Sequence, residues 1–167
     1  ALCIEQKAGP AGETAGSGFW VDYLDLERDY EEIWQAFQRD FCRGSENGGL
    51  LRCMAYAPGI RVLHQPAWET LTAFIISQNN NVPRIKGIIE RLCTAFGDPL
   101  AWGYDFPPPE RLAGLGEEDL RVLRCGWRWE YLLDAAEKVA SGQLPLDQVA
   151  VLPLPEARQA LQSIKGV

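Results

Sequence analysis

The chain has 167 residues, of which 47% are hydrophobic, and a formal net charge of −7 at pH 7; these values suit one globular domain or part of one. No stretch reaches the roughly 18 apolar residues that a transmembrane helix needs, and no signal-peptide pattern is present. The five cysteines are widely spaced without a CxxC pair, which disfavours a zinc or iron–sulfur site and indicates reduced, mostly buried thiols in a cytoplasmic protein.

The acidic net charge argues against nucleic-acid binding only if the chain is taken as a whole. Residues 1–50 hold 10 acidic and 4 basic residues, a net of −6, whereas residues 51–167 hold 13 acidic and 12 basic residues, a net of −1. The second part contains two short basic clusters, which are Arg84, Lys86 and Arg91, then Arg121, Arg124 and Arg128. DNA responds to the local potential rather than to the total charge, so DNA binding stays open.

The first part of the chain shows a short apolar piece and two helical patterns. Residues 1–7 contain Leu2-Cys3-Ile4, which we interpret as the end of a strand. Residues 8–18 are rich in Gly, Ala, Ser and Thr, which indicates a turn or loose loop. Apolar residues at three- and four-residue spacing predict a helix over 29–41, and a further helix is expected over 50–57.

From residue 66 onward the sequence predicts short helices with Pro at their starts and Gly at their ends. The helix expected over 83–96 has apolar residues at alternating spacings of three and one, and Gly97 is expected to end it as a C′ residue. This buried stripe consists of Ile85, Ile88, Ile89, Leu92, Cys93 and Phe96. Residues 98–109 are expected to form a loop. The other expected helices cover 66–78, 117–126, 127–142 and 155–166, and the fold class is mainly α.

Two turns carry residues that suit contacts with nucleic acid. Asn79-Asn80-Asn81 and Arg84 stand where one apolar helix ends and the next begins. Free backbone N–H groups at a helix N-terminus favour anions such as phosphate. The alternative is that the asparagines only cap the helix and Arg84 is solvated, although one Asn suffices for a cap.

The second turn is Gly126-Trp127-Arg128, where a large aromatic and a guanidinium follow a glycine. In a functional interpretation, Trp127 is a wedge that replaces stacking where a base has been extruded, and Arg128 reads a base. In the alternative interpretation, Trp127 packs on the core and Arg128 lies at the surface.

Together these segments resemble the 8-oxoguanine DNA glycosylase branch of the helix–hairpin–helix glycosylases. Residues 68–97 resemble that family around the Asn-Asn-Asn-x-x-Arg motif, and residues 126–128 with Tyr131 resemble its wedge turn, where Tyr is the more usual aromatic. Residues 161–167 resemble the first helix and opening hairpin of its DNA-binding motif. The resemblance runs from about residue 19 to the end of the chain.

The resemblance implies an incomplete helix–hairpin–helix glycosylase fold. Residues 1–18 would be a remnant of the family's N-terminal sheet domain. Residues 19–167 would be the helical glycosylase domain, truncated within the helix–hairpin–helix motif. The implied activity is base-excision repair with AP lyase chemistry, in which 8-oxoguanine is removed opposite cytosine. The implied partner is double-stranded DNA, bound by a monomer without a cofactor, a metal or a membrane, in a bacterial cytoplasm or a eukaryotic nucleus.

The resemblance also assigns roles by position. Asn79 would fill the gap left by the flipped lesion, Arg84 and Arg128 would contact the orphaned cytosine, and Trp127 would wedge beside it. The DNA-binding set is Asn79, Asn80, Asn81, Arg84, Trp127 and Arg128. Cytosine fits such a site, because its pairing edge offers two acceptors to the arginines and one donor to an amide carbonyl.

The family's nucleophile is a hairpin Lys that would lie three residues beyond Val167, and an assisting Asp would follow further on. Lys165 precedes the hairpin and does not match the catalytic position. We therefore expect the sequence to be a fragment open at both ends, inactive by itself. Two alternatives remain: a related glycosylase for alkylated bases, which the Asn triplet disfavours, and a non-catalytic helical DNA-binding module.

Overall fold

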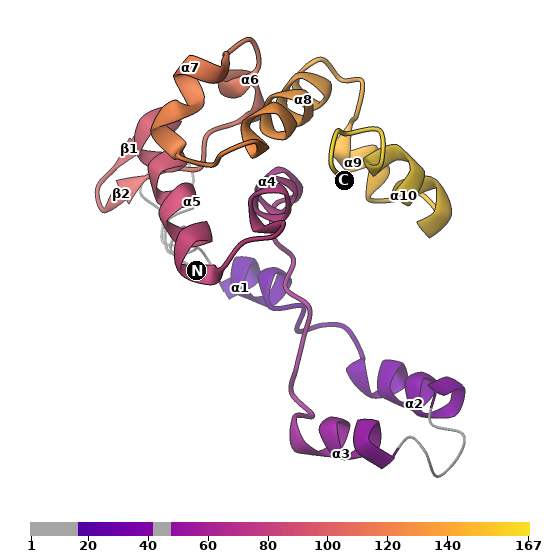
Figure 1. The fold of residues 1–167 in the computed structure, drawn as a ribbon. Helices are drawn as coiled ribbons and strands as arrows, with labels where there is room; N and C mark the ends of the chain where they lie inside the picture. The colour runs from indigo at the N-terminus through magenta and orange to yellow at the C-terminus, as the bar shows by residue number, and fades with distance from the viewer. Residues whose placement is uncertain (1–16, 42–47) are drawn as a thin grey trace. The chain divides into compact units, whose positions relative to one another are not determined.

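The computed structural model describes residues 17–41 and 48–167, which form two compact units, residues 17–65 and residues 66–167. Both units are mainly helical over these residues, as the sequence predicts (Figure 1). The strand expected at residues 1–7 lies outside the described residues. The boundary expected between residues 18 and 19 stays a prediction. Ser17 and Gly18 were expected in a loop, but they form the first turn of a helix.

Over its described residues, 17–41 and 48–65, the first unit contains three helices. They are α1 (Ser17–Tyr23), α2 (Tyr30–Phe41) and α3 (Gly48–Tyr56). The prediction of α2 is confirmed to within one residue, because Asp29 lies just before the helix and accepts a hydrogen bond from the Glu31 N–H at 2.9 Å. The helix expected over 50–57 is confirmed as α3, which begins two residues earlier.

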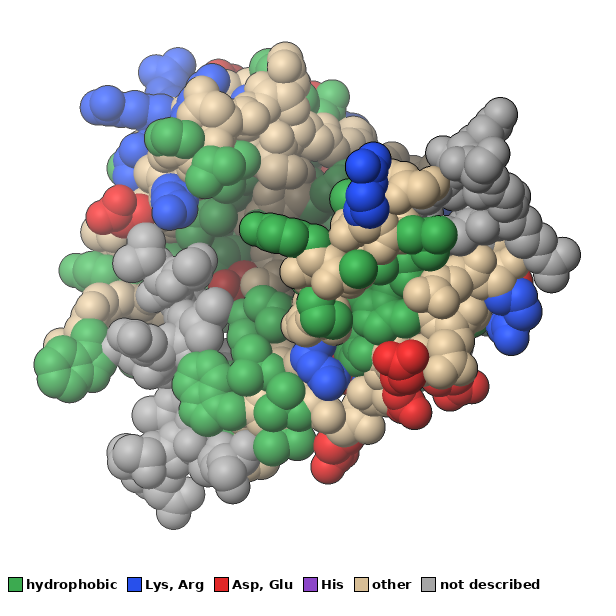
Figure 2. All heavy atoms as spheres, turned by 90° about the horizontal axis from the view of Figure 1, so that it is seen from below, with side chains coloured by type: hydrophobic (Ala, Val, Ile, Leu, Met, Phe, Trp, Pro, Cys, Tyr) green, Lys and Arg blue, Asp and Glu red, His purple; other side chains and the backbone are tan. Residues whose placement is uncertain are grey.

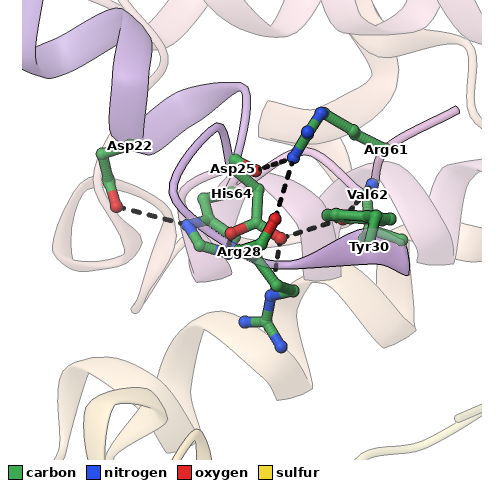
Figure 3. Close-up of polar contacts among 7 residues, drawn as sticks. All are labelled: Asp22, Asp25, Arg28, Tyr30, Arg61, Val62 and His64. Carbon is green, nitrogen blue, oxygen red and sulfur yellow. Dashed lines mark hydrogen bonds and ion pairs between the residues drawn. The ribbon is translucent and has the colours of Figure 1, made fainter. Parts of the chain in front are cut away.

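A polar cluster around Asp25 ties the segment after α1 to residues 61–64 (Figure 3). The Asp25 carboxylate accepts from the Tyr30 hydroxyl at 2.8 Å and pairs with Arg28 at 2.7 Å and with His64 at 3.4 Å. Burial acts to raise the pKa of Asp25, but the Tyr30 hydrogen bond and the nearby positive charges outweigh it, and the pKa lies below its usual value. No role was predicted for His64, and the structure gives it a structural one.

The unit of residues 66–167 contains the remaining elements. Its helices are α4 (Ala67–Ser77), α5 (Val82–Phe96), α6 (Pro109–Leu112), α7 (Glu117–Leu120), α8 (Arg128–Ala140), α9 (Leu146–Val149) and α10 (Leu154–Leu161). A short hairpin pairs β1 (Pro99–Leu100) with β2 (Gly103–Tyr104) in antiparallel register, and a 3-10 turn, η3, covers Arg121–Leu123. The hairpin, α6 and α9 were not predicted, because elements of two to four residues leave almost no periodicity in a sequence.

The core of this unit forms where α4 packs against both α5 and α8 (Figure 1). The stripe predicted on α5 is confirmed: Ile88 and Leu92 are fully buried, Cys93 is buried, and the other three residues are partly buried against the same core. From α4 the core takes Ile75 and Ile76, which are also fully buried. Since burial of such side chains drives folding, this packing fixes where the ends of the helices meet.

Gly97 ends α5, as the sequence predicts, although it stands at the Ccap position rather than at C′. Its φ is −85° and its ψ is 161°, an extended conformation that any residue can adopt. Glycine is required there because a Cβ atom would lie 1.9 Å from the carbonyl oxygen of Asp105 and 2.5 Å from that of Cys93. Close approach of the backbone, which is a tertiary feature, therefore selects the glycine.

The surface is mixed in character. On the face drawn in Figure 2, apolar side chains reach the surface at several places, and basic and acidic side chains are interspersed among them. Among the cysteines that the structure describes, Cys93 and Cys125 are buried but Cys53 is exposed, so the expectation of mostly buried thiols holds for two of these three. Within residues 17–41 and 48–167, no helix combines the length and apolar character needed to cross a membrane.

Candidate nucleic-acid interface

The turn between α4 and α5 uses two of its three asparagines to complete the helix ends. The Asn81 side chain caps α5 by accepting from the Arg84 N–H at 3.0 Å. The Asn80 amide donates to the Ile76 carbonyl at 2.9 Å and accepts from the Asn81 N–H at 3.0 Å. Helix ends leave such groups without helical partners, so the capping interpretation is confirmed for Asn80 and Asn81.

Asn79 differs from its two neighbours. Its φ is +45°, in the left-handed region that asparagine tolerates better than most residues. The residue is exposed, and among the described residues none forms a hydrogen bond with its side chain. The turn therefore presents one amide that helix capping does not use, and it belongs to Asn79.

Arg84 connects this turn to the second one. It is exposed in the first turn of α5, and its Nη2 donates to the Arg124 carbonyl at 3.4 Å. The same nitrogen lies 4.0 Å from the position of a Cβ on Gly126. The structure thus brings the two sequence motifs side by side, although 40 residues separate Arg84 from Arg124.

Arg128 is buried, with 2% of its surface exposed, which contradicts the alternative interpretation that placed it at the surface. Its guanidinium donates to three backbone carbonyls: Nε and Nη2 to Gln78, Nη2 to Asn79 at 3.0 Å, and Nη1 to Cys125 at 3.1 Å. The carbonyls at the C-terminal end of α4 lack helical partners and form the negative end of its dipole. A guanidinium suits this position because it donates several hydrogen bonds to the carbonyls and its positive charge faces the negative end of the dipole.

Trp127 is 48% exposed, so its side chain is neither buried in the core nor fully surrounded by solvent. Its ring meets that of Tyr131 edge-on, with centroids 5.1 Å apart, and the Arg128 guanidinium lies 4.5 Å from its centroid. These two contacts limit the motion of the indole while leaving about half of it accessible. Such a ring is suited to stacking, as the wedge interpretation requires.

A third turn, residues 163–167, is joined to the end of α4 through Gln78 and packs on α8, and these anchors were missed in the sequence. Gln78 donates through Nε2 to the Gly166 carbonyl, and Gly166 has a φ of +78°. A Cβ on Gly166 would lie 2.3 Å from the Tyr131 ring, so only glycine fits. Asp134, to which no role was assigned, accepts from the Lys165 N–H at 2.8 Å. The glycine was visible in the sequence, but its partner on α8 was not.

The groups beneath these turns carry positive charge. Burial raises the pKa of the Cys125 thiol, although Arg128, Arg84 and Arg91 act in the opposite direction. Arg91 also donates to the Leu123 carbonyl at 3.0 Å. Three arginines therefore converge near a neutral thiol, in a chain whose net charge is −7. A local positive potential of this kind favours a polyanion.

Comparison with known proteins relates this arrangement to DNA repair. Residues 72–163 match the family model of HhH-GPD superfamily base excision DNA repair proteins, and residues 3–71 match that of the 8-oxoguanine DNA glycosylase N-terminal domain. The N-glycosylase/DNA lyase of Saccharomyces cerevisiae is 32% identical over 125 residues, which are 71% of this chain and 30% of that protein.

Two solved structures are similar over nearly the whole chain. MBOgg1 in complex with a low affinity DNA ligand is 40% identical with a TM-score of 0.78, covering 90% of this chain and 51% of that one. The Clostridium acetobutylicum 8-oxoguanine glycosylase/lyase in complex with double-stranded DNA containing cytosine opposite 8-oxoguanine is 34% identical, with a TM-score of 0.76. It is matched over 89% of this chain and 50% of that one. This chain therefore spans about half the length of these structures and less of the yeast protein.

Proposed function

Because the chain belongs to the 8-oxoguanine DNA glycosylase family of the HhH-GPD superfamily, we propose that the whole protein is a base-excision repair glycosylase with AP lyase activity. Its substrate is double-stranded DNA in which 8-oxoguanine lies opposite cytosine. The match of residues 3–71 to the 8-oxoguanine glycosylase N-terminal domain favours this substrate over alkylated bases. The Clostridium neighbour, which is described with this base pair in its DNA, supports the same choice.

The observation that carries the proposal is the meeting of the two turns. Asn79 presents an unused amide, Arg84 lies exposed a few residues further on, and Trp127 stands half-exposed beside the turn that Arg84 contacts. An amide and a guanidinium supply the acceptor and the donors that the pairing edge of cytosine requires. The aromatic ring supplies the stacking that is lost when a base leaves the duplex, worth about 1–3 kcal/mol.

The remaining residues of the proposed interface divide by what they contact. Asn80 and Asn81 hold the turn from within, through hydrogen bonds to the backbone. Arg128 holds the same turn through hydrogen bonds to the carbonyls of Gln78 and Asn79. A contact between Arg128 and cytosine would require this buried guanidinium, 2% exposed, to become accessible. Arg84, which is already exposed, can approach cytosine without that cost.

The test is Arg84→Ala in the full-length protein, with single-turnover excision measured on duplexes that carry 8-oxoguanine opposite each of the four bases. We expect a loss of about 1–3 kcal/mol opposite cytosine and a relaxed preference among the four. Lys86→Ala is the matched control, because Lys86 is an exposed cation on the same helix.

Different outcomes test the role of Arg84 and the proposed activity of the protein. Equal losses opposite all four bases would assign Arg84 to the phosphate backbone rather than to cytosine. Failure of the unaltered full-length protein to release 8-oxoguanine from any of the duplexes would refute the proposed activity.

A further inference from the structure

Arg124 occupies a backbone conformation that arginine rarely adopts. It ends η3 with a φ of +53° and a ψ of +35°, in the left-handed region. A Cβ atom makes this conformation unfavourable, and glycine or asparagine usually fills such positions. A large side chain at a strained backbone position indicates that the side chain has a function there.

The turn needs the backbone of Arg124 but not its side chain. The Arg124 N–H donates to the Arg121 carbonyl at 3.1 Å, and the Arg124 carbonyl accepts from Arg84. Glycine would make both contacts without strain. Within the part of the chain that the structure describes, the exposed Arg124 guanidinium has no hydrogen bond or ion pair, whereas the neighbouring Arg121 pairs with Glu118 at 2.9 Å.

The side chain borders an open pocket of about 310 Å³ beside the Trp127 ring. The pocket is lined by Glu117, Leu120, Arg121, Arg124, Cys125, Gly126, Trp127 and Trp129. Leu120 and Cys125 are buried, so the base of the pocket is apolar. The Glu117 carboxylate disfavours an anion on its own side. An anion is favoured only along the segment from Arg124 to Trp127, where the Arg124 guanidinium has no ion-pair partner among the described residues.

We propose that Arg124 binds a backbone phosphate of the strand that carries the orphaned cytosine, beside the Trp127 wedge. This proposal rests on the proposed function. Arg84, the proposed reader of that cytosine, donates to the Arg124 carbonyl at 3.4 Å, so both arginines meet the same stretch of strand. A guanidinium matches a phosphate with two parallel hydrogen bonds. The contact fixes the position of the strand and reads no sequence.

The test compares Arg124→Gly and Arg124→Lys with the unaltered full-length protein, using equilibrium binding to duplexes over a range of salt concentrations. Arg124→Gly is expected to weaken binding roughly five- to tenfold, to lower the slope of log K against log salt by about 0.9, and to leave the preference for cytosine unchanged. Arg124→Lys should keep the slope. The Tm of Arg124→Gly should stay the same or rise, because the strain is relieved.

A second measurement locates the phosphate. Phosphates flanking the orphaned cytosine are replaced one at a time by uncharged methylphosphonates. One replacement should weaken binding by the unaltered protein and have no effect on Arg124→Gly, since the two changes remove the same contact. Sensitivity of both proteins to every replacement would overturn the proposal.

Equal slopes of log K against log salt for the unaltered protein and Arg124→Gly would count against the proposal. A loss of affinity confined to duplexes with cytosine opposite the lesion would also count against it. So would a lower affinity together with a lower Tm in both Arg124→Gly and Arg124→Lys. Binding is measured on undamaged duplexes too. Absence of any preference for 8-oxoguanine would refute the proposed function, while the slopes on undamaged DNA would still decide whether Arg124 contacts phosphate.

Discussion

The three successive asparagines, Asn79, Asn80 and Asn81, have identical side chains but make different contacts in this molecule. Asn81 and Asn80 are held by the backbone groups of α4 and α5, whereas Asn79 is exposed in a left-handed conformation. The difference comes from the geometry of the turn, because a side chain can cap a helix only from a few positions relative to its end. Identical residues thus divide into two that stabilise the turn and one that is available to a ligand.

At the scale of single residues, Trp127→Ala should weaken binding to a lesion-containing duplex more than binding to a single strand. The indole would replace stacking only where a base has left a duplex, so the loss should be about 1–3 kcal/mol for the duplex. Fluorescence anisotropy with both oligonucleotides measures the difference. Trp102→Ala is the control, because Trp102 is an exposed tryptophan at the tip of the β1–β2 hairpin, at 84% exposure. Unchanged duplex affinity with a lowered Tm would assign Trp127 to the core instead.

At the scale of elements, the α4–α5 turn is held by contacts from three directions. Arg128 at the start of α8 binds its carbonyls, Gln78 reaches the 163–167 turn, and Asn81 caps α5. Few of these contacts are local in sequence, and Arg128 alone spans 49 and 50 positions. A small turn is therefore ordered by the packing of the helices around it, which suits a recognition element that must hold one geometry.

The matched substitutions Asn81→Ala and Asn79→Gly separate support of this turn from recognition. Loss of the cap should lower the free energy of unfolding by about 0.5–2 kcal/mol and leave the preference for cytosine unchanged. Asn79→Gly keeps the left-handed conformation, so it should cost little stability but reduce binding to the lesion duplex. Urea unfolding and duplex binding are measured on both variants. A recognition defect confined to Asn81→Ala would contradict the division of roles.

At the scale of the whole molecule, Asp134 on α8 ties the end of the chain to the core. It accepts from the Lys138 ammonium at 2.7 Å and from the Lys165 N–H at 2.8 Å. Burial acts to raise the pKa of Asp134, but these hydrogen bonds and the charges of Lys138 and Lys165 outweigh it, and the pKa lies below its usual value. The carboxylate form is therefore the one that the fold favours.

This lowered pKa predicts how stability depends on pH. Because the folded-state pKa lies below the unfolded value of about 3.8, the unfolded chain binds more protons between the two values. The contribution is complete above the unfolded pKa and is lost as pH falls through the folded pKa. Asp134→Asn should lower the free energy of unfolding by about 1–3 kcal/mol at pH 7. It should also make the free energy of unfolding depend less on pH below pH 4, as measured by urea unfolding. Asp147→Asn, at an exposed position, is the control, and equal acid limbs in the two variants would contradict the prediction.

Much of the helical framework follows from local patterns in the sequence. The stripe on α5 and the capping asparagine could be predicted because helix period and cap chemistry act over a few residues. The proline signals were also informative, because the helix starts predicted at Pro66, Pro83 and Pro155 each lie within one residue of the observed start. The burial of Arg128 could not be predicted, because its three carbonyl partners are set by how α4 meets α8.

The sequence by itself determined the longer helices, the buried stripe and the family, since each depends on residue order and spacing. Only the tertiary structure decided that Arg128 is buried beneath the α4–α5 turn and that Arg84 meets the turn at Arg124. It also decided that, within the described part of the chain, Asn79 is the one asparagine of the triplet whose side chain forms no hydrogen bond. It also decided that Gly97 is needed for a close backbone approach. These outcomes depend on contacts between segments tens of residues apart, except at Gly97, where the chain returns after eight residues. Such contacts exist only once the core has brought the helix ends together.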